Sequence, residues 1–155
     1  MIIEPLTLSI GIGLIIGLLF AEFFGLYAGG MVVPGYVALD LYHPGTVALT
    51  LVDAIVIFII VRAMSRYLIV YGRRRIALFM LLAFILGEFF RQMFSSYFVV
   101  EQIGNIYTII GYIIPGLIAI SIDRQGVVET FSTLLTASVI VRLLMIILIG
   151  QALLV

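Results

Sequence analysis

Five ionisable residues lie inside or beside apolar stretches and are the first candidates for chemistry: Glu22, Asp53, Glu88, Glu129 and Arg142. A charge at the centre of a bilayer costs about 2.5–3.5 kcal/mol or more on insertion scales. Such side chains therefore face the protein interior or an interface. There they could relay charge or bind a charged substrate, or they could form ion pairs that fix helix register. Both interpretations stay open for Glu22, whereas we favour the structural one for Glu129 and Arg142.

Arg142 needs a partner from elsewhere in the protein. Glu129, the nearest acidic residue in the same predicted helix, is thirteen residues away, which is about 20 Å by helical rise. We expect the partner of Arg142 on another helix or another chain. Glu88 and Arg91 are three residues apart and can pair locally.

Two Pro-Gly pairs interrupt apolar, β-branched runs. Residues 32–39 read VVPGYVAL and residues 113–120 read IIPGLIAI, so they align without a gap at an offset of 81. Proline removes a backbone donor and clashes with the preceding turn. Backbone groups freed at membrane depth must be satisfied inside protein or beside a wet cavity. We therefore expect Pro34-Gly35 and Pro115-Gly116 to face inward and to break or kink their segments, as at transporter substrate sites. A proline kink repaired by neighbouring helices is the structural alternative.

Other kinds of site find no support in the sequence. His43 has Asp40 nearby, but no second histidine and no cysteine complete a usual metal site, so we predict no metal. The stretch GIGLIIG at 11–17 lacks the spacing and the strand context of a nucleotide loop, and we assign it to packing. Walker, nucleophile-elbow and HExxH motifs are absent, so no catalytic residue is assigned. If ATP is consumed in this protein's work, another chain binds it.

The composition indicates an integral membrane protein. Of the 155 residues, 65% are hydrophobic and 10% are charged, against about 25% charged residues in soluble domains. A crossing helix needs about 20 apolar residues, so one membrane domain, residues 1–155, has room for roughly four to six crossings. The zero net charge and the lack of a long basic run argue against nucleic acid as a partner. The N-terminal stretch lacks the basic region of a cleavable signal, so we expect the first segment to be retained.

Breakers divide the chain into six apolar segments, and we predict an all-α fold. The segments are residues 6–27, 29–41, 45–70, 76–98, 103–122 and 127–155. Four are long enough to span, whereas residues 29–41 would reach only about 20 Å as a helix. Each half would hold two long helices and one shorter segment broken at a Pro-Gly pair. We predict an internal repeat of approximately 6–70 and 76–155, with weak support from AEFFG at 21–25 and GEFFR at 87–91.

The arginines indicate the topology. Arg66, Arg73, Arg74 and Arg75 belong on the cytoplasmic side by the positive-inside rule. If both Pro-Gly segments re-enter, the chain crosses four times. Four arginines then lie on the cytoplasmic side and two lie outside. If both cross, the chain crosses six times. Five arginines then lie on the cytoplasmic side and one lies outside, and the two halves are inverted repeats. We favour six crossings on the margin of one arginine, Arg124.

Small residues recur every four positions along the first segment: Ser9, Gly13, Gly17, Ala21 and Gly25. Small side chains on one helix face let another backbone approach closely. We expect this face to pack against the same chain or against a second copy.

Several strings in a fixed order carry a family resemblance. They are FAEFFGLYAGGMVVPGYVAL, YGRRR and GYIIPGLIAISIDRQGVVETF, and they extend over most of the chain. Together they resemble the small membrane subunit of bacterial poly-γ-glutamate synthase, the PgsC/CapC family. The Glu-Phe-Phe at 88–90 and Arg142 have no place in the family pattern and inherit no role.

The resemblance implies a multi-pass subunit of the bacterial cytoplasmic (inner) membrane. Its complex joins glutamate through γ-amide bonds and delivers the polyanion to the surface as capsule or slime. In that family a separate ligase similar to Mur-type ligases binds ATP and Mg²⁺, and a third, membrane-anchored and largely extracellular subunit aids export. This chain would then be a non-catalytic subunit without a cofactor of its own. A second copy of the chain is a further candidate partner.

A polymer with one negative charge per residue cannot cross hydrocarbon unaided. We predict that Arg73, Arg74 and Arg75 dock the acidic ligase or its nascent polymer. Half-helices that begin at the two Pro-Gly pairs would offer amide N–H groups to carboxylates. The residues predicted along the path are Glu22, Pro34, Gly35, Tyr36, Pro115, Gly116, Gln125 and Gly126. The competing functions are an independent small transporter or channel with its site at the Pro-Gly breaks, and a scaffold.

Overall fold

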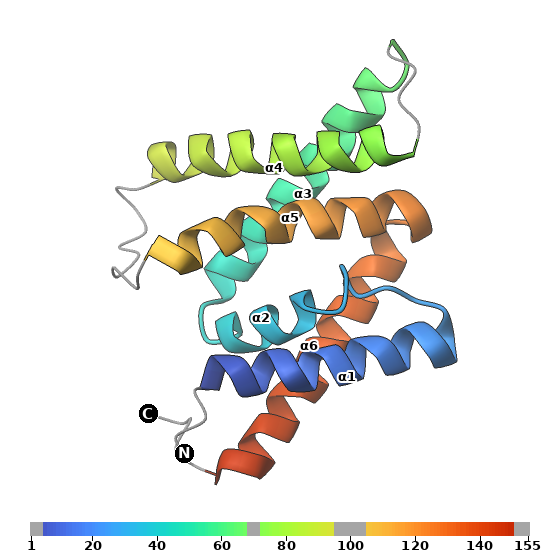
Figure 1. Cartoon of the computed structure of the whole chain (residues 1–155). Helices are drawn as coiled ribbons and strands as arrows, with labels where there is room; N and C mark the ends of the chain where they lie inside the picture. The colour runs from blue at the N-terminus through green and yellow to red at the C-terminus, as the bar shows by residue number, and fades with distance from the viewer. Residues whose placement is uncertain (1–4, 68–71, 95–104, 151–155) are drawn as a thin grey trace. The chain divides into compact units, whose positions relative to one another are not determined.

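The computed structural model describes residues 5–67, 72–94 and 105–150, which form six helices and no strand (Figure 1). The helices are α1 (Pro5–Phe24), α2 (Val33–Asp40), α3 (Pro44–Met64), α4 (Arg73–Phe94), α5 (Asn105–Gln125) and α6 (Val127–Ile149). The predicted all-α fold is confirmed, and each predicted segment corresponds to one helix. The predicted segment ends at 68–70, 95–98, 103–104 and 151–155 lie outside the described residues.

Three helices of the described part are long and apolar enough to cross a membrane. The candidate spans are Leu6–Phe24, Pro44–Met64 and Val127–Leu148. Their outward faces expose large apolar side chains, among them Phe23 at 78% and Ile147 at 75%. Extended apolar surface of this kind is not stable against water, so these faces contact lipid and the chain is a membrane protein.

The chain divides into two compact units, and these do not coincide with the predicted halves. One unit combines Met1–Ala48 with Ser121–Val155, and the other is Leu49–Ile120. The start and the end of the chain therefore belong to one unit. The internal repeat over 6–70 and 76–155 stays a prediction.

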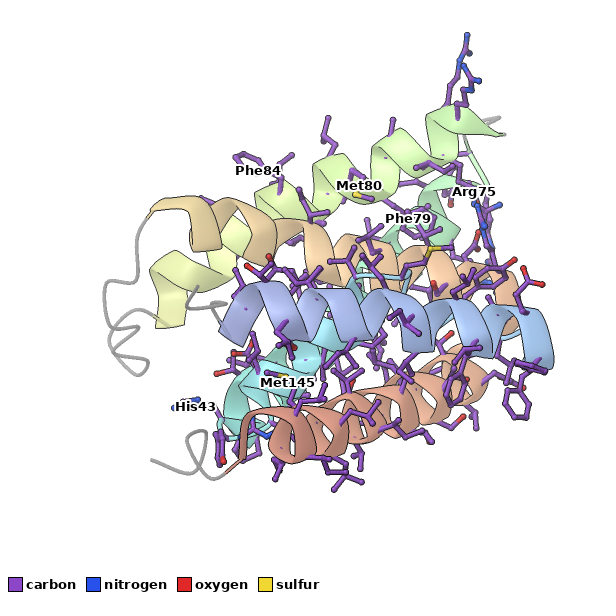
Figure 2. The ribbon with its side chains drawn as sticks, turned by 60° about the horizontal axis from the view of Figure 1, so that its bottom comes forward. His43, Arg75, Phe79, Met80, Phe84 and Met145 are labelled. Atoms are coloured by element: carbon purple, nitrogen blue, oxygen red, sulfur yellow. The ribbon has the colours of Figure 1, made fainter. Side chains whose placement is uncertain are left out.

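In the first unit, α1, α2 and α6 pack against one another. Its core joins Ala38 of α2 to Val141 and Met145 of α6, all fully buried. Figure 2 labels Met145 on α6. The apolar residues of α1 that cover this core, Leu8, Ile12 and Ile16, are spaced by four and so lie on one helix face.

The segment after α1 runs back along α1. An added Cβ on Gly17 would lie 3.2 Å from the Cα of Met31, and one on Gly13 would lie 2.8 Å from the Cα of Gly35. Leu39 packs on the same core cluster as Leu8. The non-helical residues 25–32 and α2 together thus retrace α1 from its end toward its start. A re-entrant segment would turn back toward the end of α1, so this course favours six crossings.

In the second unit, α4 and α5 lie side by side (Figure 1). α5 runs from Asn105 to Gln125 with Pro115 inside it. The expected pair of half-helices at Pro115-Gly116 is therefore wrong. Proline leaves one carbonyl of the preceding turn without its helical donor, and membrane helices tolerate this where neighbouring groups or local adjustment satisfy that carbonyl.

Candidate functional site

The first Pro-Gly pair begins α2. Pro34 lies in the first turn, where a backbone N–H would lack a helical acceptor, so proline is well suited there. The N–H groups of Gly35 and Tyr36 donate to the carbonyl of Val32, at 3.1 and 3.4 Å. The expectation that these amides are available to a carboxylate is therefore wrong. At Pro115 the expectation fails because no helix begins there.

The small residues of α1 pack against this first pair. The Ser9 hydroxyl donates a hydrogen bond of 2.6 Å to the carbonyl of Gly35. An added Cβ on Gly35 would lie 2.7 Å from the Ser9 carbonyl oxygen, and one on Gly13 would lie 2.7 Å from the Gly35 nitrogen. Both glycines are therefore required for contact between two backbones of the same chain.

Ala21 and Gly25, the last two small residues of the pattern that recurs every four positions, do not take part in this contact with Gly35. Ala21 is half-buried near the end of α1. Gly25 lies beyond α1 with φ at 64°, and an added Cβ there would meet nothing within 4 Å. Its N–H donates to the Ala21 carbonyl at 3.0 Å, so this glycine ends the helix.

The second Pro-Gly pair is packed in a similar way against α4. Pro115 and Gly116 are buried. An added Cβ on Gly116 would lie 2.9 Å from the Cβ of Ala83, 3.3 Å from the sulfur of Met80 and 3.4 Å from the carbonyl oxygen of Phe79. Figure 2 labels Phe79 and Met80 on α4. The expectation that both pairs face protein rather than lipid is confirmed by their burial.

The contacts of the two glycines correspond to one another. Gly35 lies against residues 9, 10 and 13, and Gly116 lies against residues 79, 80 and 83. The two contact sets are related by a constant offset of 70 residues. In each unit the Pro-Gly glycine thus packs on the long helix that precedes it.

Gln125 and Gly126 join the end of α5 to the connection between α1 and α2. The Tyr27 N–H donates to Gln125 Oε1 at 2.8 Å, and Gln125 Nε2 donates to the Tyr27 carbonyl at 2.6 Å. Nε2 also lies 3.2 Å from the Thr130 hydroxyl, which donates to the Gly126 carbonyl at 2.7 Å. Sequence reasoning missed this contact because Tyr27 and Gln125 are 98 residues apart. The polar groups of Gln125 therefore bind the chain itself.

Arg142 finds its partners on another part of the same chain. Its guanidinium carbon lies 3.9 Å from the centroid of the Tyr42 ring, and its Nη1 donates to the Ala38 carbonyl at 3.2 Å. A cation over an aromatic face and at the C-terminal end of α2 is favourable on both counts. Among the described residues, its partners are a ring and a carbonyl rather than a carboxylate.

The connection between α2 and α3 carries His43, which Figure 2 labels. The backbone N–H of His43 donates to the Asp40 carbonyl at 2.8 Å. Partial burial raises the pKa of the Asp40 carboxyl above its ordinary value, and His43 opposes this rise. No three His, Cys, Asp or Glu side chains gather to hold a metal ion within the described residues.

The arginine cluster, Arg73, Arg74 and Arg75, forms the first turn of α4 directly after Gly72, whose φ is 63°. Arg73 and Arg74 are exposed and Arg75 is half-buried. Cations at a helix N-terminus interact unfavourably with the helix dipole, by about 0.3–1 kcal/mol each. The exposed guanidinium groups of Arg73 and Arg74 therefore gain nothing from the helix dipole, and they can bind anions.

The remaining predicted path residues lie in the first unit. Glu22 is exposed in the last turn of α1, and Tyr36 is half-buried in α2. Pro34, Gly35, Gln125 and Gly126 belong to the same unit, whereas Pro115 and Gly116 belong to the other.

Comparison with known proteins points to one family. The family described as capsule biosynthesis CapC matches residues 12–131. The chain is 33% identical over 138 residues to the "PGA biosynthesis protein CapC" of Bacillus subtilis (strain 168), covering 87% of this chain and 89% of that protein. It is 34% identical, with the same coverage, to the "Capsule biosynthesis protein CapC" of Bacillus anthracis. No solved structure matches the chain. The matched region contains both Pro-Gly pairs, the arginine cluster and Gln125, and the chain belongs to the capsule biosynthesis CapC family.

Proposed function

We propose that this chain is a membrane subunit of a complex that synthesises poly-γ-glutamate and passes it across the bacterial cytoplasmic membrane. The observation that carries this proposal is the similarity over 138 residues to a relative named for PGA biosynthesis. In the proposal, the nucleotide chemistry belongs to a partner ligase that resembles Mur-type enzymes and binds ATP and Mg²⁺. A further membrane-anchored subunit assists export.

The arginine cluster is the proposed docking site for the ligase or for the nascent polymer. Guanidinium groups form bidentate, charge-assisted hydrogen bonds with carboxylates, and poly-γ-glutamate presents one carboxylate per residue. Arg73 and Arg74 are exposed and lie at a helix end where their charge is otherwise unfavourable. Binding an anion would remove that unfavourable interaction.

In the first unit, Glu22 and Tyr36 are the candidate contacts for the polymer along its proposed path. The glycines of both Pro-Gly pairs are in close packing contact with a neighbouring helix. We therefore assign Pro34-Gly35 and Pro115-Gly116 to holding α2 against α1 and α5 against α4. Gln125 and Gly126 would hold the connection at Tyr27.

Charge removal at the cluster tests the docking role. Cells that carry the double variant Arg73→Gln, Arg74→Gln should lose polymer output by about tenfold or more, because two bidentate carboxylate sites disappear. The variant protein should reach the membrane in normal amount. Polymer is measured at the cell surface and in the medium, and the protein is measured by immunoblot of membranes.

Two controls separate the cluster from general positive charge. The variant Arg66→Gln, Arg124→Gln removes two other exposed arginines and should keep its output. The variant Arg73→Lys, Arg74→Lys keeps the charge but loses bidentate geometry, and its output should lie between those of the other variants. Normal output from the double glutamine variant contradicts the docking role.

Reconstitution distinguishes the proposed function from an independent transporter. Liposomes that hold the purified chain alone should show no solute flux. ATP-dependent glutamate polymerisation should appear only after the ligase is added. Flux of a small solute through the chain alone would favour the transporter instead.

A further inference from the structure

Asp53 lies on the buried face of α3, inside a candidate span. Its neighbour Val52 is 52% exposed, whereas Asp53 is 9% exposed. Ile57 and Val61 follow Asp53 at intervals of four residues and are completely or almost completely buried. Residues four apart share a helix face. The Asp53 carboxyl therefore belongs to the apolar, buried stripe of a helix long enough to cross the membrane.

Among the side chains that the structure describes, no cation is hydrogen-bonded to the Asp53 carboxyl. Its Oδ1 is buried and has no hydrogen-bond partner in the part of the chain that the structure describes. Arg62, the next basic residue along α3, is nine residues away, about 13 Å by helical rise, and its guanidinium lies over the Phe58 ring.

Other charged side chains belong to the same unit as Asp53. Those whose side chains the structure describes are Arg66, which follows α3, and Arg73, Arg74, Arg75 and Glu88 of α4. None of these side chains forms a hydrogen bond with the buried Oδ1 of Asp53.

We infer that Asp53 is a proton-binding site inside the membrane, so that the folded chain carries this carboxyl in its neutral form. An ionised carboxylate buried without a partner costs several kcal/mol, and such groups bind a proton instead. The neutral carboxyl releases its proton only when this face of α3 gains access to water or to a cation. The inference concerns the chain itself and does not depend on the proposed function.

A hydrophobic carbodiimide reports directly on this proton. With dicyclohexylcarbodiimide, the carboxyl O–H proton moves to a carbodiimide nitrogen and the carboxyl oxygen bonds to the central carbon. The resulting O-acylisourea rearranges to a stable N-acylurea. No group leaves and nothing is oxidised or reduced. An ordinary aspartate in water at about pH 7 is protonated in roughly one molecule in a thousand, and so reacts slowly.

The experiment uses the full chain in membranes, treated with dicyclohexylcarbodiimide at about pH 7 and analysed by peptide mass spectrometry. We expect one adduct, on Asp53. The adduct should be retained in Asp53→Glu and in the control Glu22→Gln, which removes an exposed carboxyl of another span. In Asp53→Asn the labelling of the α3 peptide should fall by about a hundredfold, to background.

Two results of this labelling experiment would overturn the inference. They are an unlabelled Asp53 in the folded wild-type chain, or equal labelling by a water-soluble carbodiimide. Labelling that disappears when the partner subunits are present would assign the site to an interchain ion pair and would also overturn it. Size-exclusion profiles of the variants in detergent show that each is folded. Asp53→Asn should remain folded because the amide is neutral and similar in size.

Discussion

At Gly35 two backbones touch because neither helix has a side chain between them. The Ser9 hydroxyl also donates a hydrogen bond of 2.6 Å to the Gly35 carbonyl. In a bilayer, helices gain little by burying apolar side chains against each other, because the lipid is equally apolar. Close packing and such hydrogen bonds therefore provide most of the association. The stability of α2 against α1 therefore depends strongly on this residue.

The substitution Gly35→Ala should destabilise the protein by about 1–3 kcal/mol, because its Cβ would lie 2.7 Å from the Ser9 carbonyl oxygen and 3.0 Å from the Ile10 Cα. Backbone cannot move aside as a flexible side chain can. The measurement is thermal unfolding in detergent.

Gly11→Ala is the matched control for this prediction. It lies in the same helix as the contact, and an added Cβ there meets nothing within 4 Å. Its unfolding midpoint should stay equal or rise slightly, since alanine has the higher helix propensity. Equal midpoints for the two variants would show that the α1–α2 contact is loose.

At the scale of single helices, Pro34 and Pro115 differ in the backbone hydrogen bonding that each removes. Pro34 lies in the first turn of α2, where its missing N–H has no helical acceptor to lose. Pro115 lies inside α5 and removes a hydrogen bond from the helix ladder. The same dipeptide thus begins one helix and interrupts the bonding of another.

The substitution Pro115→Ala should raise the free energy of unfolding by roughly 1–2 kcal/mol, since it restores a backbone donor that neighbouring groups replace only in part. Pro34→Ala should lower it by less than about 1 kcal/mol, because only the stiffness of proline in the unfolded chain is lost. Thermal unfolding of both variants in detergent gives the comparison. A larger loss at Pro115 than at Pro34 would mean that the packing of α5 requires the proline.

Hydropathy and breakers predicted where the helices lie, because a membrane crossing requires a long apolar run. The predicted segment 29–41 contains α2, and α6 begins at Val127 as predicted. Whether Pro115 breaks a helix depends on groups from its neighbours, which spacing along the chain does not contain. The Gln125 contact with Tyr27 and the Arg142 contact with Tyr42 were unpredictable for the same reason. The small-residue pattern of α1 was visible in the sequence, but its partner was not.

At the scale of the whole molecule, the course of residues 25–40 along α1 bears on the topology. With six crossings, Arg124 lies in the cytoplasm, whereas with four it lies outside. His43 lies outside in both cases, and Arg66 lies inside in both. All three side chains are exposed, and the chain has no cysteine of its own.

Single cysteines in place of His43, Arg66 and Arg124 should therefore decide the topology. In intact cells a membrane-impermeant maleimide should label His43→Cys and leave Arg66→Cys and Arg124→Cys unlabelled. Both of the latter should react once the membrane is permeabilised. Labelling of Arg124→Cys in intact cells would show that the Pro-Gly segments re-enter and that the chain crosses four times.

The union of the chain's first and last segments in one unit has a consequence for biosynthesis. The ribosome delivers α1 and α2 to the membrane long before α6, yet their shared core needs Val141 and Met145 from α6. Until α6 is inserted, Ala38 lacks the side chains of Val141 and Met145, and Tyr42 lacks the guanidinium of Arg142. Helices that enter the bilayer earlier are thus completed by one that enters later, and a nascent chain released before α6 lacks one of the three helices that pack together in this unit.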